Sequence, residues 1–210
     1  MEKEVIQELL PPELELDTYR GKAWLGVVPF KVKNMRMRGL PRVPYLHTVL
    51  QVNIRTYVTY KGISGIYFLT IDANKRLAVW GARIGALLPY RKASMRMTTR
   101  KDGIHFQSVS RELNQDKEKL DILYHPVSNA YTPSLNSLEN WLFERYCFFV
   151  VHHKKVYRGD IHHDRWQVKR ADVKINHLPT NFRFSSIQNE PLCHYTRKKQ
   201  AFAWILKRIH

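Results

Sequence analysis

Strict alternation of apolar and polar side chains marks the clearest element that the sequence predicts, a strand over residues 50–60. Because successive side chains of a strand point to opposite faces, Leu50 and Ile54 fall on one face. Gln51 and Arg55 fall on the other face, which carries no aliphatic side chain. The strand is therefore expected to present one apolar and one polar surface.

The same period of two, bounded by turn residues, predicts strands along most of the chain. Besides the first, they cover residues 23–30, 66–71, 90–98, 104–110, 119–124, 145–151, 155–161, 171–175 and 202–209. Helical spacing is confined to short segments, namely residues 3–10, a helix capped by Asn74, and a helix beginning at Thr132-Pro133. Many hairpins with two or three short helices predict an α+β fold that is mostly antiparallel β.

Charge is the strongest compositional signal, because 35 Lys and Arg against 18 Asp and Glu give a formal net charge of +17. Such an excess suits a phosphate backbone, an anionic membrane face or an acidic small molecule, but it also describes a merely basic solvated surface. The sequence contains no helix-turn-helix, zinc-finger or RNP-type motif. Binding of nucleic acid or another polyanion is therefore kept only as an alternative function.

The expected compartment and partners are inferred from three features: apolar runs, the N-terminal residues and the cysteines. No apolar run approaches the roughly 20 residues that cross a bilayer, and the N-terminal residues do not have the layout of a signal peptide. Cys147 and Cys193 are far apart in the sequence, which favours reduced thiols over a disulfide framework. We expect a cytoplasmic protein without a membrane partner.

Several blocks of the sequence resemble one family. The block over residues 23–97 reads AWLGVVPFKVKNMRMRGLPRVP and, further on, VNIRTYVTYKGISGIYFLTIDANKRLAVWGARIGALLPYRKASMRM. TPSLNSLENWLFERYCFF, VYRGDIHHDRW and PLCHYTRKKQAFAWILKRI follow in order. These blocks are similar to the YqjF-like family, a domain of unknown function, over residues 11–209. We therefore expect residues 1–210 to form a single YqjF-like domain.

The resemblance implies the acetoacetate decarboxylase-like superfamily, and with it a cone or barrel of antiparallel strands around a partly polar cavity. Family members carry a further segment before LELDTYRGKAWLG, and here MEKEVIQELLPP stands in its place. The family segment is thus expected to be missing, which would leave a sheet edge open or covered by another chain, as in a homo-oligomer.

Decarboxylases of that superfamily form a Schiff base on a lysine, and the matching segment here is residues 88–93. On a strand, Arg91 shares a face with the small Ala93, whereas Lys92 lies on the face of Ser94. We expect Arg91 to point inward, and a guanidinium stays charged and cannot form a Schiff base. The sequence thus predicts no decarboxylase activity and no committed catalytic residue. Lyase-type chemistry on a keto acid at Lys92 is the alternative, and it needs a different register.

Two further positions concern the ligand. The family commonly has an acidic residue where this chain has Gln51, and an amide keeps hydrogen-bonding capacity but has no proton to exchange near neutral pH. For Arg55 two interpretations stay open. In an open sheet its face is wet, whereas in a closed cone it lines the cavity, where Arg55 and Arg91 could grip a carboxylate.

The remaining candidates carry weaker signals. Tyr146 could offer its hydroxyl to a pocket, and His162 could donate a hydrogen bond at its mouth. Adjacent histidines on a strand point to opposite faces, and no metal-ligand spacing is present, so neither a metal nor a cofactor is predicted. The sequence thus predicts a central β-cavity that binds a small anionic or carbonyl-bearing ligand of unknown identity. Its predicted ligand-binding residues are Gln51, Arg55, Arg91, Tyr146 and His162.

Overall fold

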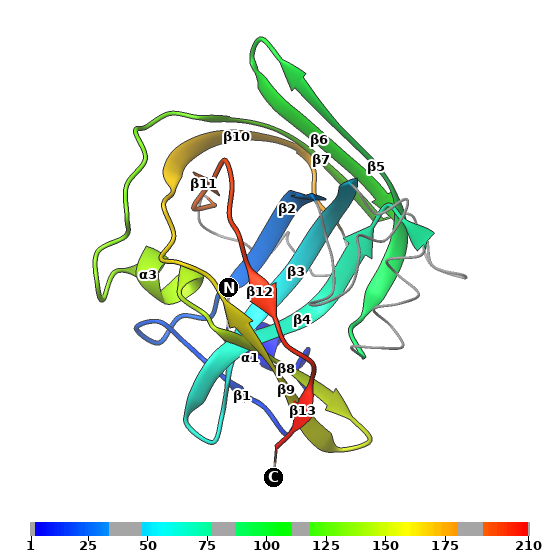
Figure 1. Cartoon of the computed structure of the whole chain (residues 1–210), viewed down its shortest axis with the longest axis vertical. Helices are drawn as coiled ribbons and strands as arrows, with labels where there is room; N and C mark the ends of the chain where they lie inside the picture. The colour runs from blue at the N-terminus through cyan, green and yellow to red at the C-terminus, as the bar shows by residue number, and fades with distance from the viewer. Residues whose placement is uncertain (1–2, 34–47, 77–86, 111–117, 180–190, 210) are drawn as a thin grey trace.

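The computed structural model describes residues 3–33, 48–76, 87–110, 118–179 and 191–209. Within these residues the chain is dominated by one extended sheet and two short helices (Figure 1). No described helix is both long enough and apolar enough to span a membrane. The strands expected from alternation all appear except the last, residues 202–209, which forms two separate short strands.

The sheet is built around three long strands. They are β2 (Leu25–Lys33), β3 (Thr48–Tyr60) and β4 (Ile63–Ala73), and they pair antiparallel. β3 and β4 form a hairpin whose turn contains Lys61 and Gly62, both with positive φ. The short β1 (Glu15–Leu16) pairs with the end of β3. These strands carry most of the residues that the sequence singled out.

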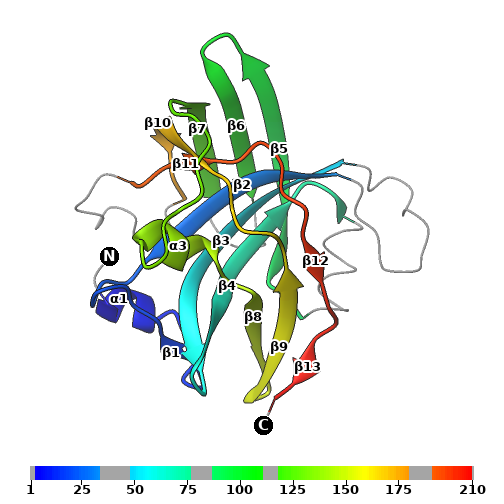
Figure 2. The ribbon, with the colours of Figure 1, turned by 60° about the vertical axis from the view of Figure 1, so that its left-hand side comes forward.

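At β4 the sheet divides into two branches. Residues 71–73 pair parallel with β5 (Tyr90–Arg100), while Ile66 and Tyr67 pair parallel with β8 (Cys147–His152). The β5 branch continues antiparallel and curves over one end of the central strands, and the β8 branch runs toward the other end (Figures 1 and 2). The sheet is therefore mixed, and its strand order runs from β11 to β12 without closing. The expectation of a mostly antiparallel sheet is confirmed, because among the described strands only the two ladders at β4 are parallel. The described strands do not close into the expected barrel.

The two branches consist of the remaining strands. The first contains β6 (Gly103–Ser110), β7 (Glu118–Pro126), β10 (Lys169–His177) and β11 (His194–Tyr195). The second contains β9 (Lys155–His162), with β12 (Phe202–Ala203) and β13 (Lys207–Arg208) paired along it.

Apolar side chains pack on both faces of the central strands. On one face Leu50, Val52 and Ile54 pack against Phe106 and Leu120 of the first branch. On the other face Tyr57, Phe68, Ile71 and Phe148 pack with the second branch and with α3 (Leu138–Phe143). The polar face that alternation assigned to β3 is thus covered, not open to water.

The helices differ partly from expectation. α1 (Lys3–Gln7) falls inside the predicted segment. α3 begins after Ser137, whose side chain caps it by accepting from the backbone N–H of Asn140, so the predicted start at Thr132-Pro133 is wrong. The helix that Asn74 was expected to cap lies mostly outside the described residues.

Candidate functional site

Sheet register decides which candidate side chains share a face. Gln51 pairs with Ala73, which pairs with Lys92, and directly paired residues of a sheet point to the same side. Asp72 pairs with both Val52 and Arg91, and these three point to the opposite side. Arg91 therefore lies on the face opposite to Gln51.

Arg55 lies on the face of Gln51. It pairs with Gly26 in an unshifted β2–β3 ladder, and a Cβ built on Gly26 would stand 3.6 Å from the Arg55 Nε. The two arginines consequently point away from each other across the sheet. The carboxylate clamp that combined Arg55 with Arg91 does not form, because β5 joins the sheet in the register that turns Arg91 to the other face.

Gln51, Asn53 and Arg55, which we call the polar row, succeed one another on a single face of β3. Gln51 is only 3% exposed, and its Nε2 donates a hydrogen bond of 3.3 Å to the hydroxyl of Tyr90. Burial raises the pKa of Tyr90, so this hydroxyl is neutral at physiological pH. Tyr90 was not expected at the site, because only the ladder between β4 and β5 places it beside Gln51.

Some buried polar atoms of this face have no hydrogen-bond partner among the residues that the structure describes. They are the Asn53 Oδ1, the Arg55 Nε and the Nε1 of Trp24, the last belonging to the residue directly before β2. Buried polar groups in folded proteins nearly always have hydrogen-bond partners, so each exception requires a physical explanation. Two donors and one acceptor of this face therefore have no hydrogen-bond partner among the described residues.

Arg55 is the charged member of the polar row. Its guanidinium makes no hydrogen bond or ion pair with any described residue, and its side chain is half-buried beside Gly26. The hydroxyl of Tyr57 stands near the same glycine, 3.6 Å from the position of an added Cβ. Because glycine has no side chain, the Arg55 side chain and the Tyr57 hydroxyl lie directly over Gly26.

Arg145 lies next to the same face, and the sequence analysis did not assign it a binding role. Its guanidinium stacks 4.3 Å from the ring centre of Trp141 and 5.2 Å from that of Tyr57. Nη1 pairs with Asp17 at 2.6 Å and Nε donates to the carbonyl of Trp141, while Nη2 is buried and has no partner in the described part of the chain. No sequence pattern links Arg145 to Asp17, because 128 positions separate them.

On the opposite face Arg91 already has a carboxylate partner. It is 6% exposed, as its alternation predicted, and its Nε and Nη2 donate to the two Asp72 oxygens at 2.7 and 3.2 Å. This bidentate geometry is the strong form of the ion pair. Arg91 is therefore engaged within the protein core.

Lys92 is exposed, as expected from alternation, and lies on the face of Gln51. Its ammonium donates to the carbonyl of Asn74 and, at 3.2 Å, to that of Ala93. Its pKa is lowered, first by partial desolvation and then by the positive charges of Arg76 and Lys75. Lys92 thus combines a weakened preference for the charged form with two acceptors that hold the charged form in place.

Tyr146 and His162 do not join the polar row. The Tyr146 hydroxyl donates to Glu144, its ring stacks on His163 at 4.7 Å, and 42% of the residue is exposed. Burial of the hydroxyl and the neighbouring Glu144 raise the pKa of Tyr146 to about 12. His162 is exposed on β9 opposite Phe202. Neither shares a hydrogen bond with the polar row in the described structure.

Metal ligands do not gather in the described part of the chain, where no group of three or more His, Cys, Asp or Glu side chains is arranged to hold an ion. The polar row itself carries hydrogen-bonding groups and one positive charge.

Comparison with known proteins places this site in context. Residues 1–200 match the family DUF2071, described as "Uncharacterized conserved protein". The "Uncharacterized protein YqjF" of Bacillus subtilis (strain 168) is 38% identical over 206 residues, which cover 97% of this chain and 84% of that protein.

Solved structures extend the comparison to the fold. An acetoacetate decarboxylase from Legionella pneumophila aligns with a TM-score of 0.55 and 12% identity, covering 100% of this chain and 81% of that one. The enduracididine biosynthesis enzyme MppR, complexed with pyruvate, aligns with a TM-score of 0.52 and 11% identity, covering 84% and 72%. The fold is thus acetoacetate decarboxylase-like. At sequence identities this low, the likeness shows the fold alone.

Proposed function

Because the chain belongs to the DUF2071 family of uncharacterised conserved proteins, we propose its function from the site itself: it binds a small carboxylate-bearing molecule at the polar row, without Schiff-base catalysis. The observation that carries the proposal is Arg55, a half-buried guanidinium without a partner among the described residues. A carboxylate is its natural complement, since its two oxygens accept the parallel N–H donors of a guanidinium.

The other members of the row refine the ligand. Asn53 presents a buried acceptor that needs a donor, which a hydroxyl or amino group beside the carboxylate supplies. The second N–H of the Gln51 amide can donate to a carbonyl or hydroxyl oxygen, because the amide has two N–H donors and only one hydrogen bond, to Tyr90, is seen. A hydroxy or amino acid of a few carbons fits this whole set of groups, while a keto acid fits Arg55 and Gln51 but offers no donor to Asn53.

Arg91, Tyr146 and His162 have different places in the proposal. Arg91 supports the site indirectly, as part of the sheet core on the other face. Tyr146 and His162 contribute to the second branch, away from the hydrogen bonds of the row. We therefore assign recognition to Gln51, Asn53 and Arg55.

Calorimetric titration of the whole chain with lactate, pyruvate, acetoacetate and malate tests the proposal. We expect at least one of them to bind, and Arg55→Ala to weaken that binding about tenfold or more, because a charge-assisted pair is lost. Arg96→Ala is the matched control, since Arg96 is an exposed arginine of β5. Absence of binding by all four acids, or equal affinity of Arg55→Ala and the parent chain, would contradict the proposal.

A second candidate function is Schiff-base chemistry on Lys92, favoured by its lowered pKa and by its place on the face of Gln51. A neutral amine would attack the carbonyl of a keto acid and form an imine with loss of water. Borohydride reduction in the presence of pyruvate or acetoacetate decides between the candidates. An adduct mapped to Lys92 supports the enzyme, and an unchanged mass supports the binding protein.

A further inference from the structure

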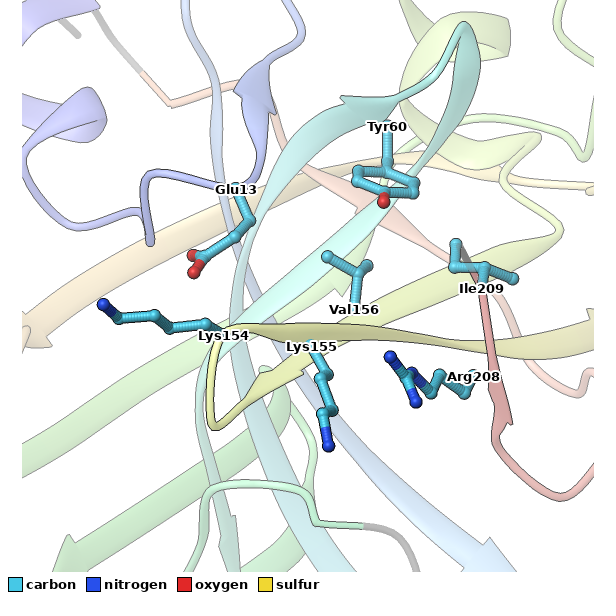
Figure 3. A pocket seen from close by; sticks show the side chains of 7 residues that line it. All are labelled: Glu13, Tyr60, Lys154, Lys155, Val156, Arg208 and Ile209. Carbon is cyan, nitrogen blue, oxygen red and sulfur yellow. The ribbon is translucent and has the colours of Figure 1, made fainter.

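A hollow lies along β3 from the polar row, where the last residue of that strand meets β9, β13 and the segment before β1. This basic pocket has a volume of about 330 Å³ and contains three cationic side chains and one carboxylate (Figure 3). Its charged residues are Glu13, Lys154, Lys155 and Arg208. The volume lies within the range of small-molecule sites, which begins at about 300 Å³.

The charges of the basic pocket are arranged by sign. In the view of Figure 3, Lys155 and Arg208 extend below the β9 ribbon, while the carboxylate of Glu13 lies above it, toward the end of the strand that carries Lys154. None of these four side chains forms a hydrogen bond or ion pair with the described residues. The pocket therefore presents two cations together at one end and a carboxylate acceptor at the other.

Between the charges the wall is apolar. Val156 is buried, and Tyr60 and Ile209 complete the surface. The ammonium of Lys61 stands 5.8 Å from the ring centre of Tyr60, which adds a further positive charge behind the ring. A ligand that joins an anionic group to a compact body would contact both kinds of surface.

The turn that carries the pocket's lysines is locally strained. His153 and Lys154 have φ of 49° and 58°, a region that costs non-glycine residues about 1 kcal/mol or more and that such hairpin turns usually fill with Asn-Gly. The neighbouring β3–β4 turn uses glycine at its second such position, Gly62. Strain of this kind is concentrated at functional sites, and both Lys154 and Lys155 line the pocket.

We propose that the basic pocket is a second binding site, for a small phosphorylated molecule that carries hydroxyl groups. Its phosphate lies on Lys155 and Arg208, because a dianion with several acceptors suits two adjacent cations better than a single carboxylate does. A hydroxyl group donates to Glu13 at the other end. The site is independent of the polar row and of the function proposed there.

Titration of the whole chain with ribose 5-phosphate, ribose and inorganic phosphate tests the site. We expect ribose 5-phosphate to bind more tightly than phosphate alone, and ribose to show no binding. The double variant Lys155→Ala/Arg208→Ala should weaken ribose 5-phosphate binding about tenfold or more, since two charge-assisted contacts are lost. Glu13→Ala should remove the advantage of ribose 5-phosphate over phosphate, because the acceptor for the hydroxyl is gone.

The matched control is Arg100→Ala/Lys101→Ala at the tip of the β5–β6 hairpin, where a different hollow contains two cations. It removes the same charge, so an equal loss of binding in the control would overturn the proposal in favour of a diffuse basic surface. Equal affinity for phosphate and ribose 5-phosphate in the parent chain would also overturn it. So would tight binding of single-stranded RNA without binding of ribose 5-phosphate. Arg55→Ala should leave phosphate binding unchanged, which separates this test from that of the polar row.

Discussion

At the scale of single residues, the buried pair of Arg91 and Asp72 should dominate local stability. Both side chains are at most 10% exposed, and two hydrogen bonds join them. Asp72→Ala leaves a guanidinium buried without its counter-charge, so we expect the free energy of unfolding to fall by about 3–5 kcal/mol. Urea denaturation followed by circular dichroism measures this change.

The control is Asp160→Ala, which breaks the pair of Asp160 with Arg158, where both side chains are about a third exposed or more. Exposed pairs contribute about 1 kcal/mol or less, so the control should lose little. The combined variant Asp72→Leu/Arg91→Met should recover much of the stability lost by Asp72→Ala. Equal losses in Asp72→Ala and Asp160→Ala would show that the buried pair is not strongly coupled.

The same pair shows how far residue-level prediction reached. Alternation within one strand correctly predicted that Arg91 is buried and Lys92 exposed. It could not say that Arg91 and Arg55 face opposite sides, because alternation gives only relative orientation within a strand. The missing information is the ladder between β4 and β5, which also supplies the partner Asp72. Gln51 and Arg55 do share a face, as alternation predicted, because both belong to one strand.

At the scale of elements, the β8–β9 turn offers a direct test of stored strain. The variant His153→Asn/Lys154→Gly replaces two residues that have positive φ with asparagine and glycine, which adopt positive φ more readily. We expect the free energy of unfolding to rise by about 1 kcal/mol, because relief of strain exceeds the entropic cost of the added glycine. Thermal unfolding measures the change, and an unchanged or lower midpoint would indicate that the native turn is not strained.

Elements also show why boundaries were harder to predict than element types. Pro133 suits a first helical position, which suggested a helix from Thr132. Asn136, however, has a φ of 65°, so the chain leaves helical geometry just before Ser137 caps α3. Likewise residues 202–209 were expected to form one strand but pair with β9 in two short pieces. Both differences arise from local backbone geometry that residue type alone does not determine.

At the scale of the whole molecule, the division of the sheet at β4 was beyond sequence reasoning. Hairpins predict antiparallel pairs between neighbours in the chain, and those were found. The ladders from β4 to β5 and from β4 to β8 are parallel and therefore need long connections, which carry no pairing signal of their own. The resemblance to a known family supplied the fold type instead, and the structural comparison confirms it.

The parallel pairing of β4 with β8 gives the prediction that concerns the molecule as a whole. A Cβ at Gly65 would lie 2.7 Å from the Phe149 ring and 2.9 Å from the Cys147 sulfur, which is closer than real Cβ atoms approach. Gly65→Ala should therefore force the second branch away from the central strands and lower the free energy of unfolding by about 2–3 kcal/mol. Chemical denaturation measures the loss, and faster hydrogen exchange in β8 and β9 than in β6 and β7 would locate it.

Gly26→Ala is the control for Gly65→Ala, because its added Cβ meets only ordinary contacts of 3.4 Å and longer. We expect it to change stability by about 0.5 kcal/mol or less. If Gly65→Ala behaved like Gly26→Ala, the two branches would not depend on close contact at β4. If instead the loss spread equally over β6 and β7, the sheet would unfold as one cooperative unit despite its division, since both branches would then respond to a change at one of them.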